Sequence, residues 1–224
     1  MKRFMIILAT ILSTLIFFTP AIAADPPKIL FVLREVVPQY LDTALTKEVV
    51  VIKNMLERAG FKVEAATTDG LPIKGSTVTF TPDLKLSDVK VDDYVGVIIA
   101  CTAGGSIPST SVSPIAVSIA KQAVTQGKPV AASHGSVIIL AEAGVLVGKR
   151  YGYWVDPLGI GRRPDDRFTG AIYGGTGVVQ DGNIITCGAC PQVAPTYGLP
   201  DGTAELTQAL INAITVKNLR VPSS

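Results

Sequence analysis

Three short apolar runs constrain the fold of this chain more than any other feature. The runs cover residues 28–34, 94–100 and 128–132. Apolar runs without polar alternation are typical of strands that are buried on both faces of a parallel sheet. Helical periodicity follows each run, in residues 49–59, 114–126 and 136–143. Strands that alternate with helices predict an α/β fold, with a mostly parallel sheet and helices on both of its faces.

Weaker patterns complete the expected set of elements. Alternation in residues 61–66 predicts a second strand after the first helix, and residues 77–80 predict a short strand near an edge. Asp181-Gly182 is a strong turn signal and predicts a hairpin from residues 176–180 and 183–186. Residues 203–216 form an amphipathic pattern that predicts a closing helix. Residues 151–175 are expected to be mostly loop.

The first 23 residues have the pattern of a secretory signal. Lys2 and Arg3 form a positive start, an apolar run covers residues 4–18, and Ala21-Ile22-Ala23 is a small-x-small cleavage site. An uncleaved anchor is the alternative, but the run is short for a bilayer span of about 20 residues. We expect cleavage after Ala23, a single domain over residues 24–224, and a periplasmic or secreted protein.

Charge and hydropathy exclude several kinds of partner. The expected signal holds two of the 20 Lys and Arg residues and none of the 18 Asp and Glu residues, so the remainder is formally neutral. A nucleic-acid partner would need a basic patch, and the sequence shows no long charge run. No later segment is long and apolar enough to predict a membrane span. We therefore expect neither a nucleic-acid partner nor a membrane partner after cleavage.

Residues that can carry chemistry follow the predicted strands directly. Ligands of parallel α/β sheets bind beyond the carboxyl ends of the strands. Residues 101–105, Ser133-His134 and residues 187–190 are all placed at such ends. Ser133 lies between a strand and a helix, where free N–H groups and the helix dipole favour negative charge.

Residues 127–149 resemble the nucleophile elbow of the ThiJ/PfpI family, in the class I glutamine-amidotransferase-like superfamily. That family typically has A-x-C-H-G-P followed by L-A-x-A-G-L-L-x-G, and here Ala-Ala-Ser-His-Gly-Ser precedes Leu-Ala-Glu-Ala-Gly-Val-Leu-Val-Gly. The strand that leads to Gly104-Gly105, the late hairpin and the last helix also resemble the family. The resemblance covers nearly all of residues 24–224, except residues 151–176, and implies a flavodoxin-like sandwich.

The resemblance implies a role for five residues. Ser133 takes the nucleophile position, His134 is the adjacent histidine, and Glu48 is the buried acid that stands 12 residues before Gly60. Backbone N–H groups near Gly104 and Gly105 would form an oxyanion hole. The resemblance further implies a small-molecule or peptide ligand, a homodimer and no cofactor. Glu48 has an alternative interpretation as a solvated residue in the first turn of a helix.

The serine at the nucleophile position leaves two functions open, an enzyme and a non-catalytic protein. An alcohol must be deprotonated by a base as it attacks, and His134 is the only imidazole in the chain. Besides this serine, the chain differs from the typical family pattern in three places. The strand before the serine is one residue shorter, Ser136 replaces proline, and the proline of the Pro-Gly-Gly turn is missing. The leading hypothesis is a hydrolase-like or lyase-like site for a small carbonyl compound or a peptide. The alternative is a non-catalytic binding or stress protein.

Cys101, Cys187 and Cys190 offer a different chemistry. Cys187-Gly-Ala-Cys190 is a C-x-x-C motif at a strand end, which can be a redox pair or half of a metal site. Redox motifs of this kind normally open a helix, whereas Pro191 follows here. The alternatives are a disulfide between two of the three, a Cys3His metal site with His134, and buried inert thiols. We expect possible redox activity and no metal.

Overall fold

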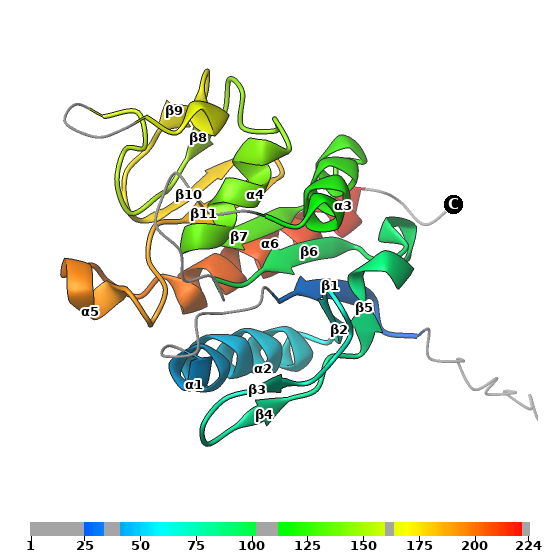
Figure 1. The fold of residues 1–224 in the computed structure, drawn as a ribbon. Coiled ribbons are helices and arrows are strands. Elements are labelled where there is room, and N and C mark those ends of the chain that lie inside the picture. Colours follow the sequence, from blue (N-terminus) through cyan, green and yellow to red (C-terminus); the bar gives the residue numbers. More distant parts are fainter. Residues whose placement is uncertain (1–24, 34–40, 102–111, 160–163, 221–224) are drawn as a thin grey trace, which may run out of the picture.

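A computed structural model describes residues 25–33, 41–101, 112–159 and 164–220 of the chain (Figure 1). Its main sheet has seven strands in the order β10-β11-β7-β6-β1-β2-β5. All neighbouring pairs are parallel except β10 and β11, which form an antiparallel hairpin. This confirms the predicted α/β fold with a mostly parallel sheet. The expected signal peptide, residues 1–23, lies outside the described residues, and export stays a prediction.

The strands of the main sheet are short and mostly buried. Their bounds are β1 Lys28–Val32, β2 Lys62–Thr67, β5 Leu84–Lys85, β6 Gly96–Ile99, β7 Val130–Ser133, β10 Val178–Asp181 and β11 Ile184–Cys187. Two small sheets lie outside it, formed by β3 Ile73–Lys74 with β4 Thr79–Phe80, and by β8 Arg150–Tyr151 with β9 Ile172–Tyr173. The strand expected in residues 77–80 is thus part of a separate hairpin, because β5 occupies the sheet edge beside β2.

The helices divide between the two faces of the sheet. Their bounds are α1 Leu41–Thr43, α2 Val50–Arg58, α3 Pro114–Thr125, α4 Val137–Glu142, α5 Ala194–Tyr197 and α6 Thr203–Arg220. A π-helical segment, Ala44–Val49, joins α1 to α2. Figure 1 shows α3 and α4 on one side of the sheet and α2 with α6 on the other. Within the described ranges, no helix combines the length and apolar character that a membrane crossing requires.

Each face of the sheet has its own apolar core. Leu30 and Ile99 belong to the cluster under α3 and α4, whereas Phe31 and Ile98 belong to the cluster under α2 and α6. Neighbouring strand residues point to opposite faces, so every central strand supplies both cores. This explains why the strands are continuous apolar runs rather than alternating ones.

Local signals determine where several of these elements begin and end. Ser113 caps α3 by accepting a hydrogen bond from the Ala116 N–H, and Pro114 occupies the first turn as predicted. Gly182 has a positive φ of 63° in the turn between β10 and β11. The parallel strands β6, β7 and β11 all end at the same edge of the sheet, and the candidate site lies there.

Candidate functional site

The chain makes a sharp turn directly after β7. Ser133 is the last residue of β7 and keeps an extended φ of −102°. His134 has a φ of +43° and is the only described residue other than glycine with positive φ. Such a backbone costs about 1–2 kcal/mol for a residue with a Cβ and is concentrated at functional sites. The strained position of the strand-to-helix turn is therefore His134, one residue after the expected nucleophile.

Cys101 is brought against His134 by the adjacent strand. It follows β6, which pairs with β7, and its Sγ lies 3.0 Å from His134 Nδ1. The Ser136 hydroxyl donates a hydrogen bond to the carbonyl of Ala100, which ties the end of β6 to the turn after β7. The thiol and the imidazole therefore form a buried Cys–His pair.

Glu48 is completely buried behind this pair, which contradicts its interpretation as a solvated residue of the first helical turn. Its Oε1 accepts the Cys101 N–H at 2.7 Å, and its Oε2 accepts from Gln192 Nε2 at 2.9 Å. Burial and the nearby Cys101 sulfur raise the pKa of Glu48 to about 8, although these hydrogen bonds oppose the rise. Ser133 Oγ lies near the carboxyl without forming a well-aligned hydrogen bond. Glu48 positions the backbone of Cys101.

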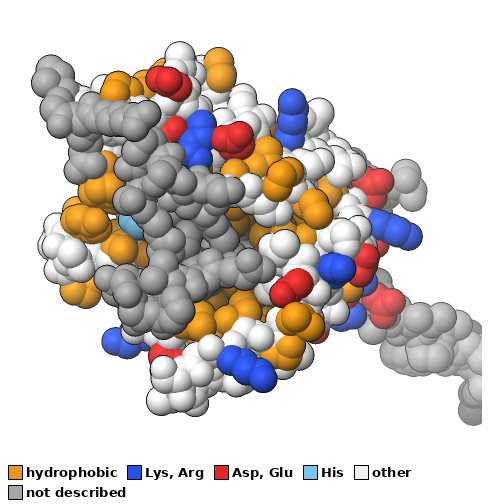
Figure 2. All heavy atoms as spheres, in the orientation of Figure 1, with side chains coloured by type: hydrophobic (Ala, Val, Ile, Leu, Met, Phe, Trp, Pro, Cys, Tyr) orange, Lys and Arg blue, Asp and Glu red, His pale blue; other side chains and the backbone are white. Residues whose placement is uncertain are grey.

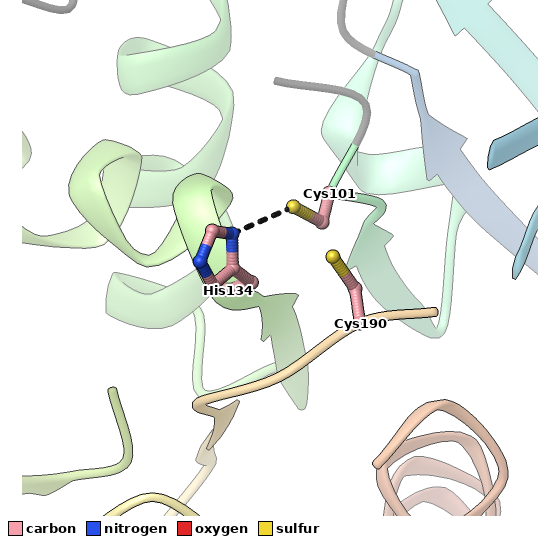
Figure 3. A group of neighbouring side chains, drawn as sticks. All are labelled: Cys101, His134 and Cys190. Carbon is pink, nitrogen blue, oxygen red and sulfur yellow. Dashed lines mark hydrogen bonds between the residues drawn. The ribbon is translucent and has the colours of Figure 1, made fainter. Parts of the chain in front are cut away.

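A second thiol faces Cys101. Cys190 lies in the loop after β11, and Figure 3 shows its sulfur beside that of Cys101, with His134 on the other side. Burial raises the pKa of the Cys101 thiol, but the Cys190 thiol, the charge of His134 and the Gly135 N–H outweigh it, and the pKa ends well below its ordinary value. Burial and the Cys101 sulfur strongly raise the pKa of Cys190. The surroundings therefore favour ionisation of Cys101 over ionisation of Cys190.

Cys187 points away from this group. Its thiol donates to the Ala189 carbonyl at 3.3 Å, and it packs against Gly202, where an added Cβ would lie 2.0 Å from the sulfur. Burial raises the pKa of the Cys187 thiol to about 11. All three cysteines are free thiols in the structure. The C-x-x-C motif is therefore divided: Cys190 faces Cys101, and Cys187 faces the last helix.

Aromatic side chains form one wall of the site. Tyr153 stacks on His134 with ring centroids 6.2 Å apart, and Trp154 lies 6.2 Å from the same ring. Tyr197 stacks on Trp154 at 4.7 Å and is 46% exposed. In Figure 2 a small part of the single histidine side chain, which is 9% exposed, is visible beside hydrophobic side chains. Sequence patterns did not predict this wall, because Tyr153 and Trp154 lie in the segment that was expected to be mostly loop.

Several polar atoms of the site lack a partner. Among the described residues, the buried side-chain atoms without a hydrogen bond are Ser133 Oγ, His134 Nε2, Tyr153 OH and Gln192 Oε1. All four belong to this site, either as members of the turn or as direct neighbours of His134 and Glu48. Buried polar atoms are normally satisfied, so their concentration here indicates a place where a polar ligand binds. The proposed oxyanion residues Gly104 and Gly105 lie outside the described residues.

Comparison with known proteins identifies relatives along most of the chain. Residues 35–198 match the model of the DJ-1/PfpI family. An uncharacterized protein of Archaeoglobus fulgidus is 41% identical over 107 residues, which are 47% of this chain and 58% of that protein. An uncharacterized protein of Methanocaldococcus jannaschii is 32% identical over 146 residues, which are 65% of this chain and 69% of that protein. The chain thus matches little more than half the length of the first relative.

Solved structures share the fold. A ThiJ/PfpI domain protein from Brachyspira murdochii is 19% identical with a TM-score of 0.63, and the match covers 84% of this chain and 96% of that one. Drosophila melanogaster DJ-1beta is 21% identical with a TM-score of 0.58, over 88% of this chain and 99% of that one. At these identities the likeness establishes the fold and no residue roles.

Proposed function

Because the chain belongs to the DJ-1/PfpI family, we propose that it is a thiol enzyme in which Cys101, rather than Ser133, attacks a small carbonyl compound or a peptide. One observation carries this proposal: Cys101 Sγ lies 3.0 Å from Nδ1 of the only imidazole in the chain. A nucleophile within hydrogen-bond distance of its base is the arrangement that covalent catalysis requires. Ser133 Oγ forms no hydrogen bond with a described residue, and the ionisable group that lies near it is the carboxyl of Glu48.

The geometry supports a simple chemical step. His134 takes the thiol proton, and Cys101 Sγ forms a bond to the carbonyl carbon of the ligand. The π electrons of the carbonyl move to its oxygen, which receives the proton back from His134. With an aldehyde this gives a hemithioacetal, and all atoms and charges balance. We expect the rest of the ligand to contact Tyr153 and Trp154, which lie beside the His134 ring, and the polar atoms there that lack a partner.

The test compares the two candidate nucleophiles in reduced, metal-free protein. We expect C101S to lower the turnover of methylglyoxal or of a peptide by about 100-fold or more, since the nucleophile and its base act as a unit. S133A should retain at least about tenfold more activity than C101S. C187S is the matched control, because Cys187 points away from the site and should leave turnover unchanged.

Other results of this comparison would indicate a different nucleophile or a different function. Turnover lost in S133A but kept in C101S would make Ser133 the nucleophile and would overturn the proposal. Protein that turns over neither compound, but still binds small carbonyl compounds at this site, would be a non-catalytic binding or stress protein. The aromatic wall and the unpaired polar atoms would then form its ligand site.

A further inference from the structure

Three metal-ligating side chains converge in the candidate site. The Sγ atoms of Cys101 and Cys190 and a ring nitrogen of His134 all lie within 4.8 Å of one another. The residues are buried, with exposed fractions of 3%, 0% and 9%. Figure 3 shows the two sulfurs and the ring turned toward a common space, although the residues come from three separate segments. The sequence led us to expect no metal here. The group contains three of the four side chains of the Cys3His alternative, and one of them, Cys190, belongs to the C-x-x-C motif.

Simpler explanations account for only part of this group. A catalytic pair uses Cys101 and His134 and leaves Cys190 without a role. A disulfide would join Cys101 and Cys190 and leave His134 aside. A single cation would bind all three donor atoms at once.

We propose that Cys101, Cys190 and His134 bind one d10 cation, Zn²⁺ or Cu⁺. Two sulfur donors and one imidazole, without a carboxylate oxygen, suit these borderline and soft cations rather than Mg²⁺ or Ca²⁺. With metal–sulfur bonds of about 2.3 Å and metal–nitrogen bonds of about 2.0 Å, tetrahedral ligand atoms lie roughly 3.5–3.8 Å apart. The three atoms all lie within 4.8 Å of one another, so shifts of about 1 Å or less would bring them to one ion. Cys101 Sγ and His134 Nδ1 would separate from 3.0 Å to about 3.6 Å to admit the ion.

The surroundings hold two of the three ligands, Cys101 and His134, in place. Glu48 accepts the Cys101 N–H, and the Ser136 hydroxyl fixes the preceding carbonyl. Tyr153 stacks on the ring of His134. Three protein ligands leave a fourth position for water or substrate on Zn²⁺, whereas Cu⁺ accepts three-coordinate sites. The hydroxyl groups of Ser133 and Tyr153, which form no hydrogen bond with a described residue, belong to the same site.

Metal binding would use the sulfur that the proposed enzyme uses as its nucleophile. The metal-loaded protein should therefore be unable to form a thiol adduct with a carbonyl compound. The metal proposal rests on ligand geometry alone and holds whether or not Cys101 turns over a substrate.

The test is a titration of the reduced, chelator-treated chain with the metals alone. Co²⁺ replaces Zn²⁺ as a spectroscopic probe and should produce thiolate-to-cobalt charge-transfer absorption at one equivalent, which Zn²⁺ then abolishes. A parallel anaerobic titration with Cu⁺ against a competing chelator decides between the two cations. We expect C101A, C190A and H134A to weaken binding by at least about 100-fold, because even changes outside the ligand shell cost about 10–100-fold. C187A should bind like the native chain.

Each result bears on the proposal. Absence of stoichiometric binding, binding that survives in both C101A and C190A, or binding that C187A abolishes would overturn it. Thermal unfolding without metal shows whether each variant is folded, and C190S and C101S replace any alanine variant that is not. Turnover is measured on metal-free protein, so failure of the metal site and failure of the enzyme are separate observations.

Discussion

At the scale of single residues, Glu64 is a side chain away from the candidate site that forms two ion pairs. It lies on β2 and is 14% exposed, and its carboxylate contacts Lys28 Nζ at 2.9 Å, Lys62 Nζ at 3.0 Å and the Tyr94 hydroxyl at 2.9 Å. Burial by itself raises the pKa of Glu64, but hydrogen bonds from these three groups outweigh it and lower the pKa to about 2. The cluster joins the starts of the neighbouring strands β1 and β2 to the segment before β6.

Because of Glu64, the free energy of unfolding should decrease at acid pH. Its folded pKa lies below the ordinary value of 4.5, so its contribution is complete above pH 4.5 and is lost as pH falls from there toward 2. Because Lys28 and Lys62 are partly exposed, we expect E64Q to lower the free energy of unfolding by only about 1 kcal/mol at neutral pH. Chemical denaturation at several pH values checks this. The two proteins should converge near pH 2, and a difference independent of pH would contradict the assignment.

A surface ion pair is the matched control for Glu64. Lys53 and Glu57 pair at i,i+4 on the exposed side of α2. E57Q should change the free energy of unfolding by less than about 0.5 kcal/mol, because exposed pairs of this kind contribute little.

At the scale of elements, the candidate site depends on how closely the loop after β11 approaches the segment after β8. Gly188 donates a backbone hydrogen bond to the Thr176 carbonyl. A Cβ at Gly188 would lie 2.4 Å from that oxygen and 2.7 Å from the carbonyl carbon of Tyr153. These neighbours are backbone atoms and cannot rotate away. The absence of a side chain at Gly188 thus allows Cys190 and the aromatic wall to belong to one site.

We expect G188A to destabilise the protein by about 1–3 kcal/mol, as overpacking typically does. G177A is the matched control, because a Cβ there meets nothing within 4 Å. Chemical denaturation of the two variants measures the difference. Equal stabilities would show that the loop shifts freely and that its contact with Tyr153 does not position the site.

At the scale of the whole molecule, one sheet supports both apolar cores. Leu30 and Phe31 are consecutive residues of β1, are both fully buried, and belong to opposite clusters. Neither core can be lost without exposing the sheet that carries the other. The described chain should therefore unfold as a single cooperative unit.

Truncation on either face tests this cooperativity. We expect L30A to cost about 2–5 kcal/mol and F31A about 3–5 kcal/mol, and each should shift one unfolding transition without splitting it. L71A is the control, since Leu71 is 61% exposed. Circular dichroism and tryptophan fluorescence should report the same midpoint. Two separate transitions in either variant would show that the faces unfold independently.

Much of the architecture could be predicted from local patterns. The apolar runs at residues 28–34, 94–100 and 128–132 each contain a central strand, and the capped helix after Ser113 lies where its signals predict it. The two-residue strands β3, β5, β8 and β9 were not predicted, because elements this short have no periodicity. Residues 77–80 were placed at a sheet edge, but pairing with β3 rather than β2 is a tertiary choice.

Local sequence patterns were sufficient to place the strand ends to within one or two residues and to predict a sharp turn after β7, because periodicity and turn chemistry act between near neighbours. Two features follow from the tertiary fold instead: the positive φ belongs to His134, and Cys101 lies against it, 33 residues away in the chain. The tertiary fold also placed Cys190, rather than Cys187, beside Cys101. The physical reason is the strand order: β6, β7 and β11 are adjacent and parallel, so their carboxyl ends meet at one edge, and no local pattern encodes which strands become neighbours.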